Sequence, residues 1–246
     1  MLRDFAEYLL VSFPIDITAQ IRLNKYRRLK LKDNAILDAG CGRGQIALAL
    51  RKKNAEVVGM DFDGPNIQRL NRVVKKLGDK KTTFYCADFT GKQQGLGKRF
   101  DAIVCSQVLE HIEDDFSVLK SFNHFLRDGG VLYLDVPNSK NVRNKADKTA
   151  PGGHVRAGYS KDDERLFESA GFQIERMEYF THNMFLRLFN SGYALENRGH
   201  RKLGAAFRLL WFGLTYPLCL LDNHLPKGPE SSLAVMFVLR KIRDVN

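Results

Sequence analysis

Residues 36–44 (ILDAGCGRG) constrain the fold of this 246-residue chain more than any other segment. An apolar run ends in the acid Asp38, glycines follow at positions 40, 42 and 44, and a helical pattern starts directly afterwards. Glycine adopts the left-handed backbone that a tight turn requires, and it lets a ligand lie against the main chain. This order predicts a strand, a turn and a helix start that border a ligand site.

The glycine spacing separates two classes of nucleotide cofactor. A dinucleotide site has the pattern G-x-G-x-x-G, with an acid roughly 20 residues later. This chain has G-x-G-x-G instead, and Asp38 lies two residues before the first glycine. The pattern therefore indicates a cofactor other than a dinucleotide.

Apolar strand patterns alternate with helical patterns along most of the chain. The expected strands are 35–38, 56–61, 82–87, 100–106, 131–136, 172–180 and 232–241. The expected helices are 44–53, 65–77, 114–125 and 160–170. Gly129 and Gly130 are expected to stop the helix at 114–125, and a capping box at Ser160 and Asp163 is expected to start the helix at 160–170. Strands joined by helices imply right-handed βαβ units and a parallel sheet covered on both faces.

Composition and charge narrow the class of protein and its partners. The formal net charge of +11 favours an anionic partner, which is nucleic acid, an anionic membrane face or an acidic substrate. The four cysteines (Cys41, Cys86, Cys105 and Cys219) form no metal-binding or CxxC spacing, which is typical of free thiols in a reducing cytosol. The first residues include acids and lack the apolar core of a signal peptide, so we expect a cytoplasmic protein.

The carboxyl ends of the next strands carry groups that suit an adenosine-containing ligand. Asp61 ends the second expected strand, where its carboxylate can accept both hydroxyls of a ribose. Asp88 follows the third strand, where it can accept from an adenine amino group, with Phe62 or Phe89 against the ring. Ligands of open parallel sheets bind beyond these strand ends.

These motifs resemble, in order and spacing, those of the class I S-adenosylmethionine-dependent methyltransferases. The resemblance covers residues 29–180 and the final strand. It implies a Rossmann-like, doubly wound, seven-stranded sheet with an antiparallel last strand, and S-adenosylmethionine as the cofactor. It also implies the cofactor-binding residues Asp38, Gly40, Cys41, Gly42, Gly44, Asp61, Phe62, Asp88, Phe89, Ser106 and Val108. By that resemblance the glycines lie along the methionine part, Asp38 orients the turn amides or the ammonium, and Ser106 or Val108 closes the site from below.

Two histidines are candidates for catalysis. His111 follows Glu110 after the fourth strand, and this pair resembles quinone-biosynthesis methyltransferases, some of which hold a divalent metal with a further acid. Gln107 stands at that acid's position here, so we expect no metal. The alternative is that Glu110 and His111 only cap a helix and line the cofactor pocket.

The glycine-flanked loop 152–160 contains the second candidate, His154. It resembles a histidine-containing loop of small-molecule methyltransferases, in which His154 would be a general base and Arg156 or Tyr159 would hold an acidic acceptor. A purely structural loop is the alternative. Asn138, at the end of the fifth strand, has either a ligand contact or a turn role.

The sequence divides into four parts. They are N-terminal helices (1–33), a methyltransferase core (34–181), a helical insertion (182–229), and the last core strand with a tail (230–246). The insertion contains the uncharged run 209–221, which is shorter than the roughly 20 residues that span a bilayer. Its apolar residues beside cations fit an interfacial membrane helix, a lid over an apolar substrate, or a packed subdomain. The cationic run 22–32 is either a phosphate or lipid headgroup site or a solvated helix face.

The leading functional hypothesis is a methyltransferase with a small-molecule acceptor, for which a lipid-linked, envelope or quinone-pathway compound is the candidate. The enzyme would be cytoplasmic, with peripheral contact at an anionic inner membrane face. One alternative is an RNA or protein methyltransferase, although no RNA-binding appendage accompanies the basic charge, so nucleic acid is not the expected partner. The other is an inactive peripheral membrane-binding module. The residues leave the acceptor atom and the oligomeric state open.

Overall fold

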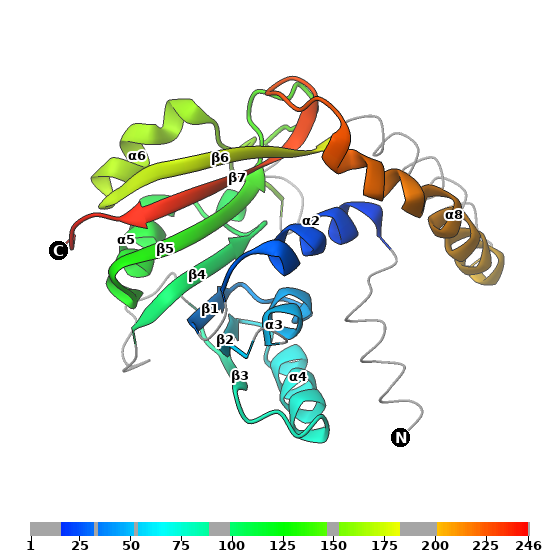
Figure 1. Cartoon of the computed structure of the whole chain (residues 1–246), viewed down its shortest axis with the longest axis horizontal. Coiled ribbons are helices and arrows are strands. Elements are labelled where there is room, and N and C mark those ends of the chain that lie inside the picture. The colour runs from blue at the N-terminus through cyan, green and yellow to red at the C-terminus, as the bar shows by residue number, and fades with distance from the viewer. Residues whose placement is uncertain are drawn as a thin grey trace.

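The computed structural model describes residues 16–31, 34–51, 54–88, 99–146, 153–182 and 201–245 (Figure 1). The helix expected near the N-terminus and the side chain of Phe89 lie outside these residues.

A single seven-stranded sheet organises the chain, in the order β3-β2-β1-β4-β5-β7-β6. Its strands are β1 (Ala35–Ala39), β2 (Glu56–Asp61), β3 (Thr82–Cys86), β4 (Phe100–Ser106), β5 (Leu126–Pro137), β6 (Phe172–His182) and β7 (Ser232–Lys241). The first five strands are parallel, whereas β7 runs antiparallel to both β5 and β6. This confirms the predicted sheet with its antiparallel last strand. Strand order reverses between β1 and β4, which is where ligands of such sheets bind.

Helices cover both faces of the sheet. They are α2 (Ile17–Arg28), α3 (Gln45–Leu50), α4 (Gly64–Lys76), α5 (Asp115–Phe125), α6 (Glu164–Ser169) and α8 (Arg201–Leu221). Alternate strand residues point to opposite faces, so Ile36 packs with α2, α3 and α4 while Leu37 packs with α5 and α6. Two apolar layers therefore hold the sheet between them, as the near-continuous apolar strands predict.

The predicted bounds of the third and fourth helices are confirmed, but the role given to Gly129 and Gly130 is wrong. Ser160 and Asp163 form the expected capping box, at the start of the 3₁₀ turn Lys161–Asp163 that precedes α6. Gly129 and Gly130, by contrast, do not end α5, because that helix stops at Phe125 and β5 begins at once. The glycines lie in an irregularity of β5, where Gly129 has a φ of +69° and the pairing with β4 shifts. The glycine pair thus serves a strand bulge, which needs the same left-handed backbone as a helix end.

A helix, α8, lies between β6 and β7, and it contains the uncharged run found in the sequence. It extends beyond the sheet and packs against α2 (Figure 1). The Thr215 hydroxyl donates to the Trp211 carbonyl at 2.7 Å, two residues before Pro217 interrupts the helical hydrogen bonds. Among the described residues, no helix has the length and apolar character that crossing a membrane requires.

Candidate active site

The glycine turn between β1 and α3 has the predicted left-handed backbone, with φ of +72° at Gly40, +47° at Gly42 and +77° at Gly44. A β-carbon on Gly40 would lie 2.4 Å from Cγ2 of Val108, and one on Gly44 would lie 2.6 Å from Cδ2 of Leu70. Real β-carbons do not approach so closely. Both positions therefore require glycine for conformation and for space.

The amides of Gly40, Cys41 and Gly42 in this turn are bonded within the protein. Those of Gly40 and Cys41 donate to the Met60 carbonyl at 2.8 and 2.9 Å, and that of Gly42 donates to the Asp61 carboxylate at 2.8 Å. These three amides already have partners, and ligand contact at the turn stays a prediction. A phosphate cradle needs free amides, so the turn offers close approach of the backbone rather than an anion site.

Beyond the turn, a cavity of about 750 Å³ opens at the carboxyl ends of β1, β2, β3 and β4. The predicted residues that line it are Gly40, Cys41, Gly42, Asp61, Phe62, Asp88, Ser106, Val108 and His111. Asp38, Gly44 and His154 are not among the lining residues. The tertiary structure thus brings together residues that are spread over 70 positions of the chain, from Gly40 to His111.

Asp38 lies beneath the turn rather than in the cavity. Its carboxylate is buried and accepts from the Ala47 amide of α3 at 2.9 Å. Burial, together with the nearby Asp61, raises the pKa of Asp38 to about 7, although the hydrogen bond from the Ala47 amide opposes this shift. Asp38 therefore ties the start of α3 to β1 through the Ala47 amide, and the role expected for it toward the turn amides or the ammonium stays a prediction.

Asp61 is the carboxylate that faces the cavity from β2. Its two oxygens accept from the amides of Gly42 at 2.8 Å and Asp63 at 3.0 Å. A carboxylate has about four lone-pair sites, so these bonds fix its orientation and leave acceptor capacity for two ligand hydroxyls. This pattern fits a ribose.

Helix α2 forms a roof over the cavity, which the sequence reasoning did not foresee. Ala19, Arg22 and Leu23 line it from one face of that helix. Nε of Arg22 lies 2.7 Å from the carboxylate of Asp135, which is fully buried in β5. The spacing of these three lining positions (i, i+3, i+4) is the sequence signal for this face, but the partner of Arg22 lies 113 positions away.

Two side chains at the end of β4 also donate hydrogen bonds to the Asp135 carboxylate. The Ser106 hydroxyl donates to it at 2.8 Å, and the side-chain amide of Gln107 donates at 3.1 Å. Gln107 also has a φ of +56°, and its backbone amide donates to the Asp135 carbonyl at 2.8 Å. Ser106 and Gln107 therefore hold the Asp135 carboxylate beside the cavity, and the cofactor contact expected for Ser106 stays a prediction.

Glu110, His111 and His154 form a cluster in which one ligand atom of each lies within 4.8 Å of the others. Glu110 is buried, and neither of its oxygens has a hydrogen-bond partner among the described residues. Burial, together with the nearby Asp135, raises the pKa of Glu110 to about 8. A carboxyl that is neutral at pH 7 is a weak metal ligand. The absence of a metal stays a prediction.

The two histidines of this cluster differ in position. His111 lines the cavity, and its Nδ1 lies 3.2 Å from the Gly153 carbonyl. His154 packs edge-to-face on His111 with ring centroids 4.8 Å apart. Partial burial lowers the pKa of His154, and the charge of His111 lowers it further. His154 thus packs on His111 and is not itself a cavity residue.

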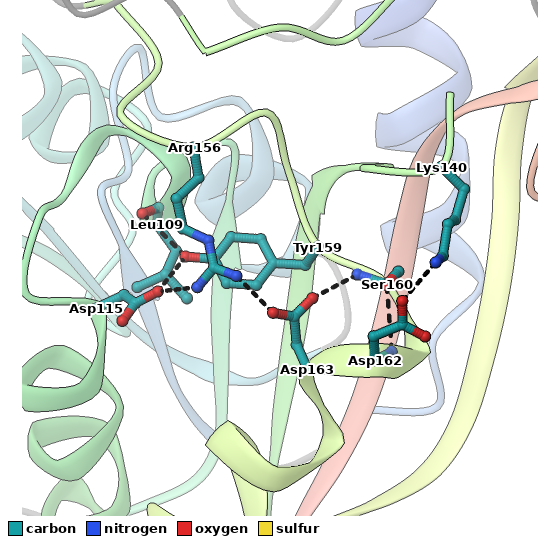
Figure 2. A network of polar contacts seen from close by, with 8 residues as sticks. All are labelled: Leu109, Asp115, Lys140, Arg156, Tyr159, Ser160, Asp162 and Asp163. Atoms are coloured by element: carbon teal, nitrogen blue, oxygen red, sulfur yellow. Dashed lines mark hydrogen bonds and ion pairs between the residues drawn. The ribbon is translucent and has the colours of Figure 1, made fainter. Parts of the chain in front are cut away.

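Arg156 and Tyr159, which were expected to hold an acidic acceptor, are engaged within the protein (Figure 2). Arg156 pairs with Asp115 and with Asp163 at 2.5 Å each, and the Tyr159 hydroxyl donates to Asp115 at 2.9 Å. Tyr159 is also fully buried. These contacts fasten the loop at 153–160 to the start of α5, so its structural interpretation is the correct one for both residues.

Asn138 likewise has a turn role. It is buried, and its side-chain amide donates to the carbonyls of Pro229 at 2.5 Å and Ser232 at 2.8 Å. These bonds join the end of β5 to the turn that leads into β7.

The fold and the cavity define a nucleotide-cofactor enzyme of the Rossmann-like type. The chain matches the methyltransferase domain family over residues 17–177, and it belongs to that family. S-adenosylmethionine is the cofactor that this membership indicates, and the glycine turn without an anion cradle and the oriented Asp61 fit it.

Similar proteins of known name support the same class. The chain is 32% identical over 111 residues to the ubiquinone biosynthesis O-methyltransferase of Histophilus somni, covering 44% of this chain and 47% of that protein. It is 30% identical over 130 residues to the protein of that name from Coxiella burnetii, covering 51% and 53%. The chain thus spans about half the length of the curated relatives it matches.

Solved structures show the fold over almost the whole chain. The [4+2]-cyclase SpnF has a TM-score of 0.63 at 17% identity, covering 91% of this chain and 80% of its own. Coclaurine N-methyltransferase, bound to N-methylheliamine and SAH, has a TM-score of 0.59 at 15% identity, covering 92% and 72%. Because one neighbour is named as a cyclase, the fold alone does not decide the reaction.

Proposed function

We propose that this protein transfers a methyl group from S-adenosylmethionine to a small-molecule acceptor bound in the cavity beneath α2. The observation that carries the proposal is that one cavity collects the glycine turn, Asp61, Asp88 and His111. Bound there, the cofactor supplies an electrophilic methyl on a sulfonium. The protein would contribute orientation and exclusion of water, because the cofactor carries the reactive carbon.

The cofactor-binding assignment follows the cavity lining. Gly40, Cys41 and Gly42 would lie along the methionine part, and Asp61 would accept the ribose hydroxyls. Phe62, which is largely exposed at the rim, and Asp88 would border the adenine. Val108 supports Gly40 from below, which is the closing role proposed for it.

His111 is the residue we propose as the proton acceptor. When its ring is neutral, a hydrogen bond to the Gly153 carbonyl requires the proton on Nδ1, which leaves Nε2 as the acceptor. This suits an acceptor hydroxyl or amine that loses its proton during methyl transfer. His154 would act through His111, since it packs on that ring and does not line the cavity.

The acceptor we propose is lipid-linked and is reached at the inner face of a membrane. The roof and floor of the cavity include Leu23, Ile46 and Ile112, which provide apolar contact. Similarity to ubiquinone biosynthesis O-methyltransferases supports a lipid-related acceptor.

The first test replaces the proposed ribose ligand. Asp61→Asn keeps one carbonyl oxygen as an acceptor for the turn, but it removes the charge and half of the acceptor capacity. We expect affinity for S-adenosylmethionine, measured by isothermal calorimetry, to fall by about 10- to 100-fold. Asp128→Asn, at a side chain that is 92% exposed on β5, should bind like the wild type.

Two outcomes would oppose the proposal. If the Asp61 variant bound S-adenosylmethionine with unchanged affinity, the assignment of Asp61 to the cofactor site would be wrong. A wild-type protein that binds the cofactor but releases no S-adenosylhomocysteine with any acceptor extract would favour the inactive membrane-binding module.

A further inference from the structure

Helix α8 exposes an apolar stripe. The side chains of Leu210, Leu214, Leu220 and Leu221 are 68%, 65%, 50% and 52% exposed, and Gly213 and Pro217 are exposed between them. Of the nine large hydrophobic side chains that are exposed among the described residues, these four lie on one helix. Scattered exposed leucines are ordinary, but a continuous stripe marks a contact surface.

The opposite side of α8 is already occupied. Phe212 and Thr215 are buried, and Tyr216 and Leu218 pack against the core that includes Ile17 and Ile21 of α2. The helix is thus anchored by one side, and its leucine stripe is held outward. The fold of the described residues does not cover the stripe.

A cationic pocket includes Lys227 from the segment that follows α8. It has a volume of about 460 Å³ and lies between α2, β6 and the segment after α8. Four cations and one carboxylate line it: Lys25, Arg28, Arg176, Lys227 and Glu178. Glu178 is shared by Lys25 at 2.5 Å and Arg176 at 2.9 Å. Even with the buried Asp222 that pairs with Lys227 at 3.2 Å, the pocket has excess positive charge.

The distribution of charge along α8 also favours contact with an anionic surface. Its 21 residues include no Asp or Glu, and its three cations (Arg201, Lys202 and Arg208) all lie in its first eight residues. The leucine stripe is therefore bracketed by cations in the sequence, with Lys227 six residues beyond Leu221. An apolar helical face flanked by Lys and Arg is the pattern of a helix that lies in the interface of an anionic bilayer.

We propose that the leucine stripe and the cationic pocket together form the docking surface for an anionic phospholipid bilayer. The stripe enters the boundary between headgroups and acyl chains, and the pocket takes a lipid phosphate. A second copy of this chain fits less well, because it would bring equal positive charge to the same face. The inference rests on the membrane part of the proposed function and assigns the surface that serves it.

Vesicle flotation of the full chain tests the docking surface. Wild type should float with vesicles of phosphatidylglycerol and phosphatidylcholine, and much less with phosphatidylcholine alone. The triple variant Leu210→Gln, Leu214→Gln, Leu221→Gln should lose about tenfold or more in partition. Val142→Gln with Ile242→Gln, at exposed apolar side chains elsewhere, should float like wild type.

Two further double variants test whether the pocket itself, and not only the net positive charge of the protein, contributes to vesicle binding. Arg28→Gln with Arg176→Gln should weaken flotation more than Lys75→Gln with Lys76→Gln, which removes equal charge from exposed positions of α4. Equal loss in both pairs would overturn the phosphate pocket. Inorganic phosphate that competes at millimolar concentration would show a free-anion site instead of a lipid site.

Three results would overturn the whole proposal: no flotation of wild type, flotation of the leucine variant like wild type, or a dimer in light scattering that the leucine variant abolishes. Each variant is also titrated with S-adenosylmethionine by calorimetry. Retained cofactor binding shows that the variant is folded. It also separates failure of the docking surface from failure of the cofactor site.

Discussion

At the residue scale, the left-handed glycines of the turn are the most sensitive positions. Gly40 and Gly44 combine a positive φ with a blocked β-carbon, and the blocking atoms belong to Val108 and Leu70 on other elements. The turn is thus held by contacts across the fold and by its own backbone preference. A methyl group added there disturbs both.

We predict that Gly44→Ala lowers the free energy of unfolding by about 1–2 kcal/mol from the left-handed backbone alone, with a further loss from the contact with Leu70. Urea denaturation measures it. Gly213→Ala is the matched control, since nothing lies within 4 Å of its β-carbon position on α8. That change should stabilise the helix by up to about 1 kcal/mol. Equal effects at both positions would contradict the role of the turn.

At the element scale, the ion pair of Arg22 with Asp135 fastens α2 at the cavity, and a second pair, Lys25 with Glu178, ties the same helix to β6. Arg22 reaches from the roof to the buried Asp135, which Ser106 and Gln107 also contact. Removing Arg22 leaves a buried carboxylate with only neutral partners among these contacts. The stability of the fold and the shape of the cavity therefore depend on the same pair.

We predict that Arg22→Met costs about 2–3 kcal/mol of unfolding free energy and weakens cofactor binding. The double variant with Asp135→Asn should recover part of the stability, because it removes the uncompensated charge. As a control, Arg240→Met breaks an exposed pair with Glu175 and should cost about 1 kcal/mol or less. If α2 were only a surface helix, Arg22→Met and Arg240→Met would lower the free energy of unfolding by similar small amounts.

At the scale of the whole molecule, two buried carboxyls couple stability to pH. Burial raises the pKa of Asp38 to about 7 and that of Glu110 to about 8. Between roughly pH 4 and pH 8 the folded state holds protons at these sites that the unfolded chain has released. Their contribution to the free energy of unfolding therefore decreases as the pH rises through this window.

We predict that Glu110→Gln removes part of this dependence. Its melting temperature should be close to that of wild type near pH 5, where both chains are neutral at this position. It should exceed the wild-type value near pH 8 by a few degrees, on the order of 1 kcal/mol or more. Calorimetric melting at the two pH values measures the difference. A constant difference at both values would show that Glu110 keeps an ordinary pKa.

The sequence patterns by themselves determined the strands of the sheet, the glycine turn and the capping box at Ser160, whereas the antiparallel last strand was implied by the family resemblance. These depend on local patterns, namely apolar periodicity, acids at strand ends and glycine where φ is positive. The family membership also follows from residues 17–177 as a linear pattern. The strand bulge at Gly129 was misread because a bulge and a helix end need the same backbone.

Only the tertiary structure decided which polar groups are free to act. In the fold, Arg22 pairs with Asp135. Arg156 pairs with Asp115, and the Tyr159 hydroxyl donates to the same carboxylate. The Asn138 side chain donates to the turn before β7. Each of these partners lies far along the chain or on another element, so no spacing rule could reveal it. The exposure of the α8 leucines was decided in the same way, because the helical pattern shows an apolar face, but only packing shows which face stays uncovered.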